Sequence, residues 1–146
     1  MNIELKIDEK YKNTTLVVYT DKVDEEISNI IDTISNIEKK ILKCYREEKL
    51  YILEQSKIES IYSEDGKIYV RSDNEIYTVK NRLYELEEML DKKIFVRISN
   101  SEIINMKKVK NIDLKLRGTM LFNFTSGNTA YVSRRYINKI KEYLEI

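Results

Sequence analysis

The sequence predicts a mainly β fold with short helices (α+β), preceded by a small ββα segment at its N-terminus. Three observations lead to this prediction. From residue 41 onward, short runs rich in β-branched and aromatic residues recur between polar turns. Only two brief helical patterns interrupt these runs. The first 40 residues instead carry two β-rich runs and one long amphipathic stretch, so we divide the 146 residues into a segment 1–40 and a domain 41–146.

The N-terminal segment begins with two predicted strands. Ile3–Ile7 alternates apolar and polar residues, and Thr14–Thr20 is β-branched and aromatic. A helix is predicted over Lys22–Lys40, with Asp21 as its candidate cap. Its apolar stripe recurs at steps of three and four residues and includes Ile27, Ile30, Ile34 and Ile37. A segment this small must bury that stripe on the rest of the chain or on another copy.

Five short predicted strands open the domain. They are Ile41–Arg46, Leu50–Leu53, Ile58–Ser63, Lys67–Ser72 and Glu75–Lys80. The sequence SEDGK between the third and fourth strands predicts a hairpin turn, because Gly66 accepts a positive φ. The sequence SDNE predicts a second turn between the fourth and fifth strands.

The rest of the domain mixes helices and strands. Leucine spacing predicts a helix over Asn81–Asp91, and Ser133 is the candidate cap of a final helix over Ser133–Leu144. The small polar residues that begin Ser99–Asn105 favour a turn or a short helix. The remaining predicted strands are Lys93–Ile98, Val109–Leu116, Thr119–Phe124 and Thr129–Val132.

The composition removes most routes to catalysis. The chain has no His, one Cys and three Gly, so it lacks Ser–His and Cys–His pairs, His-containing metal sites and glycine-rich phosphate loops. We therefore expect no enzyme activity, no catalytic residue, no metal site and no cofactor. Cys44 lies in a strand-like run, where we expect a buried, small apolar side chain. The single Cys and the absence of a long apolar run predict a cytoplasmic protein without membrane insertion.

Charge is distributed unevenly along the chain. Residues 1–40 carry a net charge of −3, residues 41–91 carry −4, and residues 92–146 carry +8. A compact basic region favours a polyanionic partner, and the commonest is nucleic acid. A solvated basic surface without any partner gives the same charge pattern.

Basic and amide side chains form the candidate binding groups. The basic ones are Lys107, Lys108 and Lys110, followed by Arg134, Arg135, Lys139 and Lys141. A turn with Asn100 and Ser101 precedes the first of these groups. Asn reads adenine edges, Arg reads guanine edges, and Ser holds phosphates. The alternatives are turn and cap chemistry for the Asn and Ser side chains, and plain surface charge for the arginines.

Two longer motifs lie in the basic half, FVRISNSEIINMKKVKNID at Phe95–Asp113 and AYVSRRYINKIKEYL at Ala130–Leu144. Together with the upstream hairpin at Ile58–Val70, they resemble the LytTR family of bacterial DNA-binding domains over about residues 41–146. The matching positions are Phe95, Arg97, Ser101, Ile104, Asn105, Val132, Ser133, Arg134 and Arg135. The chain departs from the family pattern at Ser99, where the family commonly has a His.

The resemblance implies an elongated β fold of small sheets whose loops enter successive major grooves of double-stranded DNA. Base contacts are then expected from Lys67, Asn100 and Arg135, and phosphate contacts from Ser101, Lys107, Lys108, Arg134 and Lys139. It also implies a sequence-specific transcriptional regulator that binds paired direct-repeat half-sites as a homodimer.

Members of this family often carry a phospho-receiver domain, for which the 40 residues before the β domain are too few. We expect the isoleucine stripe of this segment either to form a dimer interface or to pack on the β domain. A different class of function is also open at this stage: a protein-interaction or ligand-sensing module whose basic half docks an acidic partner.

Overall fold

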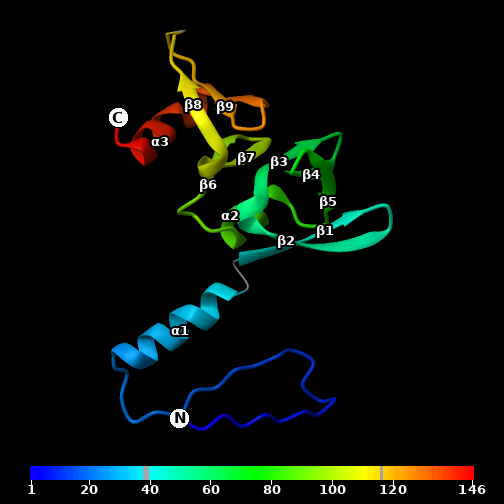
Figure 1. The fold of residues 1–146 in the computed structure, drawn as a ribbon, viewed down its shortest axis with the longest axis vertical. Coiled ribbons are helices and arrows are strands. Elements are labelled where there is room, and N and C mark those ends of the chain that lie inside the picture. The colour runs from blue at the N-terminus through cyan, green and yellow to red at the C-terminus, as the bar shows by residue number, and fades with distance from the viewer. Residues whose placement is uncertain (38–39, 116) are drawn as a thin grey trace. The chain divides into compact units, whose positions relative to one another are not determined.

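The computed structural model describes residues 1–37, 40–115 and 117–146 (Figure 1). The chain divides into two compact units, Met1–Thr33 and Ile34–Ile146, and each is described by itself. No helix of the described residues is long and apolar enough to cross a membrane.

The N-terminal residues differ from the prediction. Ile3–Ile7 and Thr14–Thr20 are irregular rather than strands, with Ile3 exposed by 89% and Val17 by 60%. An isolated two-stranded ribbon is marginal in water unless a third strand or a helix covers it, so β-propensity alone was a poor guide. The ββα segment is therefore an irregular stretch followed by a helix.

That helix is α1, Glu25–Ile37. Its cap is Asp24, whose Oδ1 accepts from Ile27 N at 3.0 Å, and not Asp21 as predicted. The helix starts three residues later than predicted, and the predicted residues 38 and 39 lie outside the described residues. None of the residues of α1 is buried.

A seven-stranded antiparallel sheet forms the larger part of the domain, with the strand order β2-β1-β5-β4-β3-β7-β6. Its strands are β1 Ile41–Arg46, β2 Lys49–Glu54, β3 Ile58–Glu64, β4 Lys67–Ser72, β5 Glu75–Val79, β6 Phe95–Ser99 and β7 Glu102–Asn105. The first five agree closely with the predicted runs. A 3-10 turn, η2 at Gln55–Lys57, connects β2 to β3.

Both predicted hairpin turns are confirmed. Asp65 and Gly66 have φ values of 50° and 77°, and Asp73 and Asn74 have 50° and 62°. Two consecutive residues with positive φ match the twist of the flanking strands, which is why Asp, Asn and Gly are found there. The registers that result pair Glu64 with Lys67 and Ser72 with Glu75.

A smaller three-stranded sheet has the order β10-β9-β8. Its strands are β8 Val109–Asp113, β9 Leu121–Phe124 and β10 Thr129–Tyr131, and a 3-10 turn, η3 at Met106–Lys108, leads into it. Residue 116, at the end of the predicted strand Val109–Leu116, lies outside the described residues. The other helices are α2 at Leu83–Met89 and α3 at Arg134–Leu144, both shorter than predicted.

Strand β7 corrects the prediction of a turn or short helix over Ser99–Asn105. Ile103 and Ile104 are consecutive and both buried, at 1% and 0% exposure, so the segment shows no polar alternation. A strand that is buried on both faces cannot be recognised from a period of two, which explains the error.

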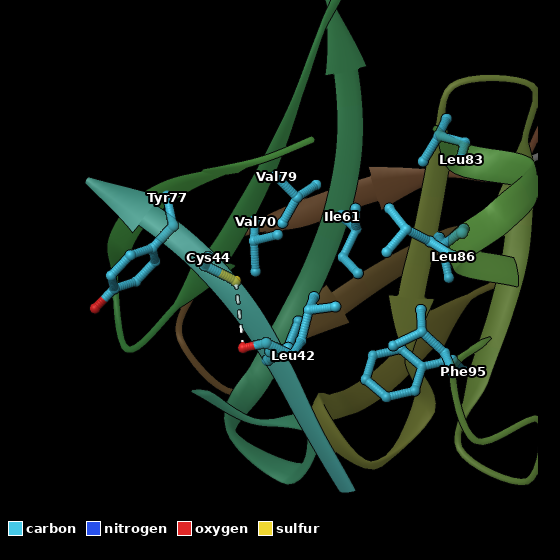
Figure 2. Packing of buried hydrophobic residues seen from close by; sticks show 12 residues of the cluster. Leu42, Cys44, Ile61, Val70, Tyr77, Val79, Leu83, Leu86 and Phe95 are labelled. Carbon is cyan, nitrogen blue, oxygen red and sulfur yellow. Dashed lines mark hydrogen bonds between the residues drawn. The ribbon is translucent and has the colours of Figure 1, made fainter. Parts of the chain in front are cut away.

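The described part of the domain contains two hydrophobic cores. The first core is built from β1 to β5 and α2, and Figure 2 shows Leu42, Cys44, Ile61 and Val70 packed in it. The second core is built around Phe122, Met120 and Ile140. The β6–β7 hairpin serves both cores, as Ile103 packs in the first and Ile104 in the second.

Cys44 is confirmed as a buried, small apolar side chain. It has no exposed surface, and its thiol points to the Leu42 carbonyl at 3.8 Å (Figure 2). Burial raises the pKa of the Cys44 thiol to about 12, so the reactive thiolate is not formed near neutral pH.

Candidate nucleic-acid interface

The turn between β6 and β7, called the central loop (residues 99–102), is fastened by Arg97. Its Nε donates to the Ser99 carbonyl at 3.0 Å, and its Nη2 donates to the Asn100 carbonyl at 2.7 Å. Its Nη1 donates to the Glu87 carboxylate at 2.8 Å, and the side chain is only 16% exposed. Because the guanidinium is used within the protein, Arg97 shapes the loop rather than offering a charge to solvent.

Two serines complete the central loop. Ser99 Oγ accepts from Ser101 N at 3.2 Å, and the two hydroxyl oxygens lie 3.2 Å apart. Ser99 therefore takes a turn-forming role. The resulting turn leaves Asn100 and Ser101 exposed.

The side chain of Asn100 is oriented by α3. Its Oδ1 accepts from the Tyr136 hydroxyl at 3.0 Å. Within the described part of the chain its Nδ2 donates no hydrogen bond, so both of its amide N–H groups can donate to a ligand. Sequence reasoning missed Tyr136, since a tyrosine directly after two arginines on a helix carries no distinguishing spacing.

The turn between β3 and β4, called the hairpin loop (residues 63–67), is tied to the central loop. Ser63 N donates to the Ser101 carbonyl at 2.8 Å. The hairpin loop exposes Lys67, but it also exposes the carboxylates of Glu64 and Asp65. This loop therefore carries more negative than positive charge.

The start of α3, called the helix junction (residues 132–136), is tied to β6. Ser133 N donates to the Ile98 carbonyl at 2.9 Å. The predicted cap is not made: Ser133 precedes α3, but its hydroxyl is buried and has no hydrogen-bond partner among the described residues. Arg134 and Arg135 are exposed at the first turn of the helix.

The three predicted base-contacting residues thus lie on three segments that are hydrogen-bonded in series. The Ser63–Ser101 bond joins the hairpin loop to the central loop, and the Tyr136–Asn100 bond joins the central loop to the helix junction. The structure therefore brings Lys67, Asn100 and Arg135 to one connected row, with Ser101 and Arg134 beside them.

The other predicted phosphate contacts are lysines on η3 and α3. Lys107 and Lys108 are on η3, at the far end of β7 from Ser101, and a four-residue strand spans about 13 Å. Lys139 is on α3, but its ammonium lies 3.5 Å from the Glu87 carboxylate. Lys107 and Lys108 do not join the row of linked loops, whereas Lys139 lies one helical turn from Arg135 with its charge paired.

The carboxylate of Glu87 interacts with two cations, one of which holds the central loop. It accepts from Arg97 and pairs with Lys139, so α2, β6 and α3 meet at one carboxylate. Burial alone would raise the pKa of Glu87, but the hydrogen bond and charge of Arg97, with the charge of Lys139, outweigh it and hold that pKa below its ordinary value. The group stays ionised near neutral pH and keeps Arg97 in place.

Asn105, another residue of the recognised motif, has a structural role. It is fully buried, its Nδ2 donates to the Ile58 carbonyl at 2.8 Å, and its Oδ1 accepts from Lys107 N at 2.9 Å. Phe95 is in the first core. These two motif residues therefore stabilise the domain rather than form the binding surface.

An antiparallel β domain that presents Asn and Arg side chains on a connected row of exposed loops has the features of a nucleic-acid-binding domain that uses loops. The chain belongs to the LytTR family: the family model described as the LytTr DNA-binding domain matches residues 48–145. The predicted family and the mainly β fold class are both confirmed.

Solved and curated relatives agree with this assignment. The LytTr DNA-binding domain of a Bacillus cereus protein described as a methyl-accepting/DNA response regulator superposes with a TM-score of 0.71 at 26% identity, over 74% of this chain and 99% of that one. An HTH-type transcriptional regulator of Staphylococcus aureus strain MSSA476 is 28% identical over 100% of this chain and 99% of its own length. Its counterpart in strain NCTC 8325 is 27% identical with the same coverage.

The "HTH-type" part of these names does not describe the present fold. In the described residues, α2 and α3 are separated by the five strands β6 to β10 instead of a short turn.

Proposed function

We propose that this protein is a transcriptional regulator that binds double-stranded DNA in a sequence-specific way, with its loops in the major groove. The observation that carries the proposal is the hydrogen-bonded series of three exposed loops with Asn100 and Arg135 on it. Family membership and the regulators among its relatives support it. The proposal includes a bacterial cytoplasmic location, where the DNA target lies.

Roles within the row follow from side-chain chemistry. Asn100 can donate from Nδ2 to adenine N7 and accept from adenine N6 with the second lone pair of Oδ1, while Arg135 is suited to guanine. Lys67 is the third proposed base contact. Ser101 and Arg134 are proposed phosphate contacts beside them, and Lys107, Lys108 and Lys139 are proposed outer phosphate contacts.

The test is selection from a pool of random duplexes, followed by fluorescence anisotropy on the selected and on a scrambled duplex. We expect a preference of about 10³-fold or more near 0.15 M salt, as for specific DNA-binding proteins. Equal binding that disappears on both duplexes as salt rises contradicts the proposal. That result instead favours a basic half that docks an acidic protein partner.

We also propose that the protein binds paired direct-repeat half-sites as a homodimer that forms through α1. The support is the apolar stripe of Ile27, Ile30, Ile34 and Ile37 on a helix that buries none of its residues. Ile30→Asp is expected to abolish dimers in light scattering. Asn36→Asp adds the same charge on the opposite helix face and is expected to leave them intact. A dimer that survives Ile30→Asp contradicts this role.

A further inference from the structure

A cleft of about 750 Å³ lies beside the row of linked loops. The hairpin loop forms one wall, and the central loop contributes Asn100. The connection between β5 and α2 forms the other wall with Lys80, Asn81 and Arg82. This connection belongs to none of the three loops expected to contact bases.

Three cations and two acids that form no ion pair among the described residues line the cleft, which leaves it a net positive charge. Lys67, Lys80 and Arg82 are exposed, and none of them forms an ion pair within the described part of the chain. Lys80 Nζ lies 4.8 Å from the centre of the Tyr45 ring, an interaction that orients the ammonium without cancelling its charge. The nearby acids Glu64 and Asp65 pair with none of these three cations. An external anion is therefore the complementary ligand.

The position of the cleft selects the kind of anion. It lies between the hairpin loop and the central loop, two segments that are proposed to enter the major groove. Loops in successive major grooves are separated by a minor groove and by the phosphates that flank it, and duplex DNA carries one negative charge per about 1.7 Å of its axis. A basic surface between two such loops faces those phosphates.

We propose that Lys80 and Arg82, on the connection between β5 and α2, bind phosphates of the DNA backbone that passes between the hairpin loop and the central loop. This inference rests on the proposed function and adds one more DNA-contacting segment to it. The contact supplies positive charge next to the hairpin loop, whose own acids would otherwise repel the duplex. It strengthens binding to every sequence alike, because phosphates carry no base identity.

The test compares a double variant, Lys80→Gln with Arg82→Gln, to a control with the same charge change, Lys49→Gln with Lys57→Gln. The control lysines are exposed and lie at strand ends remote from the hairpin loop. Anisotropy is measured on selected and random duplexes as a function of salt. Each lost phosphate contact lowers the slope of log K against log salt by about 0.9, so we expect the double variant to lose about 2 from the slope on both duplexes. The control is expected to keep the parent slope.

Three further measurements distinguish the proposed contact with the DNA backbone from a folding defect and from a site for free phosphate. Lys80→Arg with Arg82→Lys keeps both charges and is expected to keep the slope. Methylphosphonate substitution at the backbone position between the two loop contacts is expected to weaken the parent protein but not the double variant. Inorganic phosphate at about 1 mM is expected to leave the thermal unfolding of the DNA-free protein unchanged.

Three outcomes overturn the inference: an unchanged slope in a folded double variant, a loss confined to the selected duplex, or saturable binding of inorganic phosphate at the cleft. Failure of the proposed function gives different results from failure of this inference. If the proposed function is wrong, the parent protein prefers no duplex and Arg135→Ala does not change binding.

Discussion

The hairpin loop and the helix junction occupy the two ends of the same row, and they differ in charge rather than in geometry. Each is fixed to the central part of the row by one hydrogen bond, Ser63 N to the Ser101 carbonyl at 2.8 Å and Tyr136 OH to Asn100 Oδ1 at 3.0 Å. The hairpin loop carries one lysine and two carboxylates, whereas the helix junction carries two arginines and no acid.

This difference teaches that position alone does not decide which loop supplies affinity. A carboxylate about 4 Å from a phosphate is repelled by about 1 kcal/mol even in bulk water, which offsets what Lys67 gains from a similar contact. The helix junction has no such opposing charge. We therefore expect most of the binding free energy at the helix junction and little from the hairpin loop itself.

The largest expected effect concerns Glu102, an acid in β7 opposite Tyr62 of β3. Burial raises the pKa of Glu102 to about 7, against the charge of Arg71 and together with the charge of Glu59. The folded state then holds a proton that the unfolded state releases near pH 4.5. Stability consequently falls as pH rises from about 4.5 to about 7, by at most about 3 kcal/mol, and levels off above that.

Glu102→Gln removes this titration and keeps the neutral shape. Urea unfolding is expected to show parent and variant alike near pH 4.5 and the variant more stable at pH 8. A variant that is less stable than the parent at pH 8 shows that the ionised carboxylate is instead stabilised by Arg71.

The second prediction compares the two ends directly. Arg135→Ala is expected to cost about 1–3 kcal/mol on the selected duplex, roughly 5- to 150-fold in Kd, and to relax specificity at one base. Lys67→Ala is expected to cost under about 1 kcal/mol, because neighbouring acids already offset its charge. Anisotropy on the selected duplex and on its single-base variants measures both. Equal losses of binding free energy for Arg135→Ala and Lys67→Ala contradict the expected difference between the helix junction and the hairpin loop.

The third prediction concerns the bond that joins the helix junction to the central loop. Tyr136→Phe removes the hydroxyl that orients Asn100, and a hydrogen bond of this kind contributes about 0.5–1.5 kcal/mol. We expect a two- to tenfold loss on the selected duplex and little change on random DNA. Tyr131→Phe, at an exposed tyrosine of β10, serves as the control. The same loss on both duplexes shows that Tyr136 does not act through base recognition.

The smallest expected effect has the opposite sign. Glu64→Gln with Asp65→Asn removes both acids of the hairpin loop, and Asn tolerates the φ of 50° at residue 65. Affinity is expected to rise about two- to threefold at low salt, and the gain is expected to shrink near 0.15 M salt because exposed charges are screened. An affinity that falls indicates that these acids contact bases, since a cytosine amino group is read by a carboxylate.

Local signals in the sequence predicted much of the domain. Asp65–Gly66 and Asp73–Asn74 have positive φ, and residues with that tolerance mark hairpin turns wherever they occur. The alternating runs that became β1, β4 and β5 each bury one face more than the other, which preserves a period of two. The two family motifs identified the LytTR fold from residues 95–113 and 130–144.

The secondary-structure predictions were wrong in two situations. In one, a β-rich run has no further strand to pair with; in the other, a strand packs in two cores and shows no alternation. Ile3–Ile7 and Thr14–Thr20 have strand composition, but the N-terminal unit provides no third strand on which to pair. Ile103 and Ile104 belong to two different cores, so β7 has no polar face to reveal its period.

The sequence by itself determined the turns, most strands, the family and the candidate contact residues, because those depend on backbone propensities and short motifs. Only the tertiary structure decided that Arg97 turns inward to hold the central loop and that Tyr136 orients Asn100 from α3. It also separated Lys107 and Lys108 from the row and placed Lys80 and Arg82 beside it. The physical reason is that these outcomes depend on which residues far apart in sequence share a hydrogen bond or a cleft, and no local spacing encodes that.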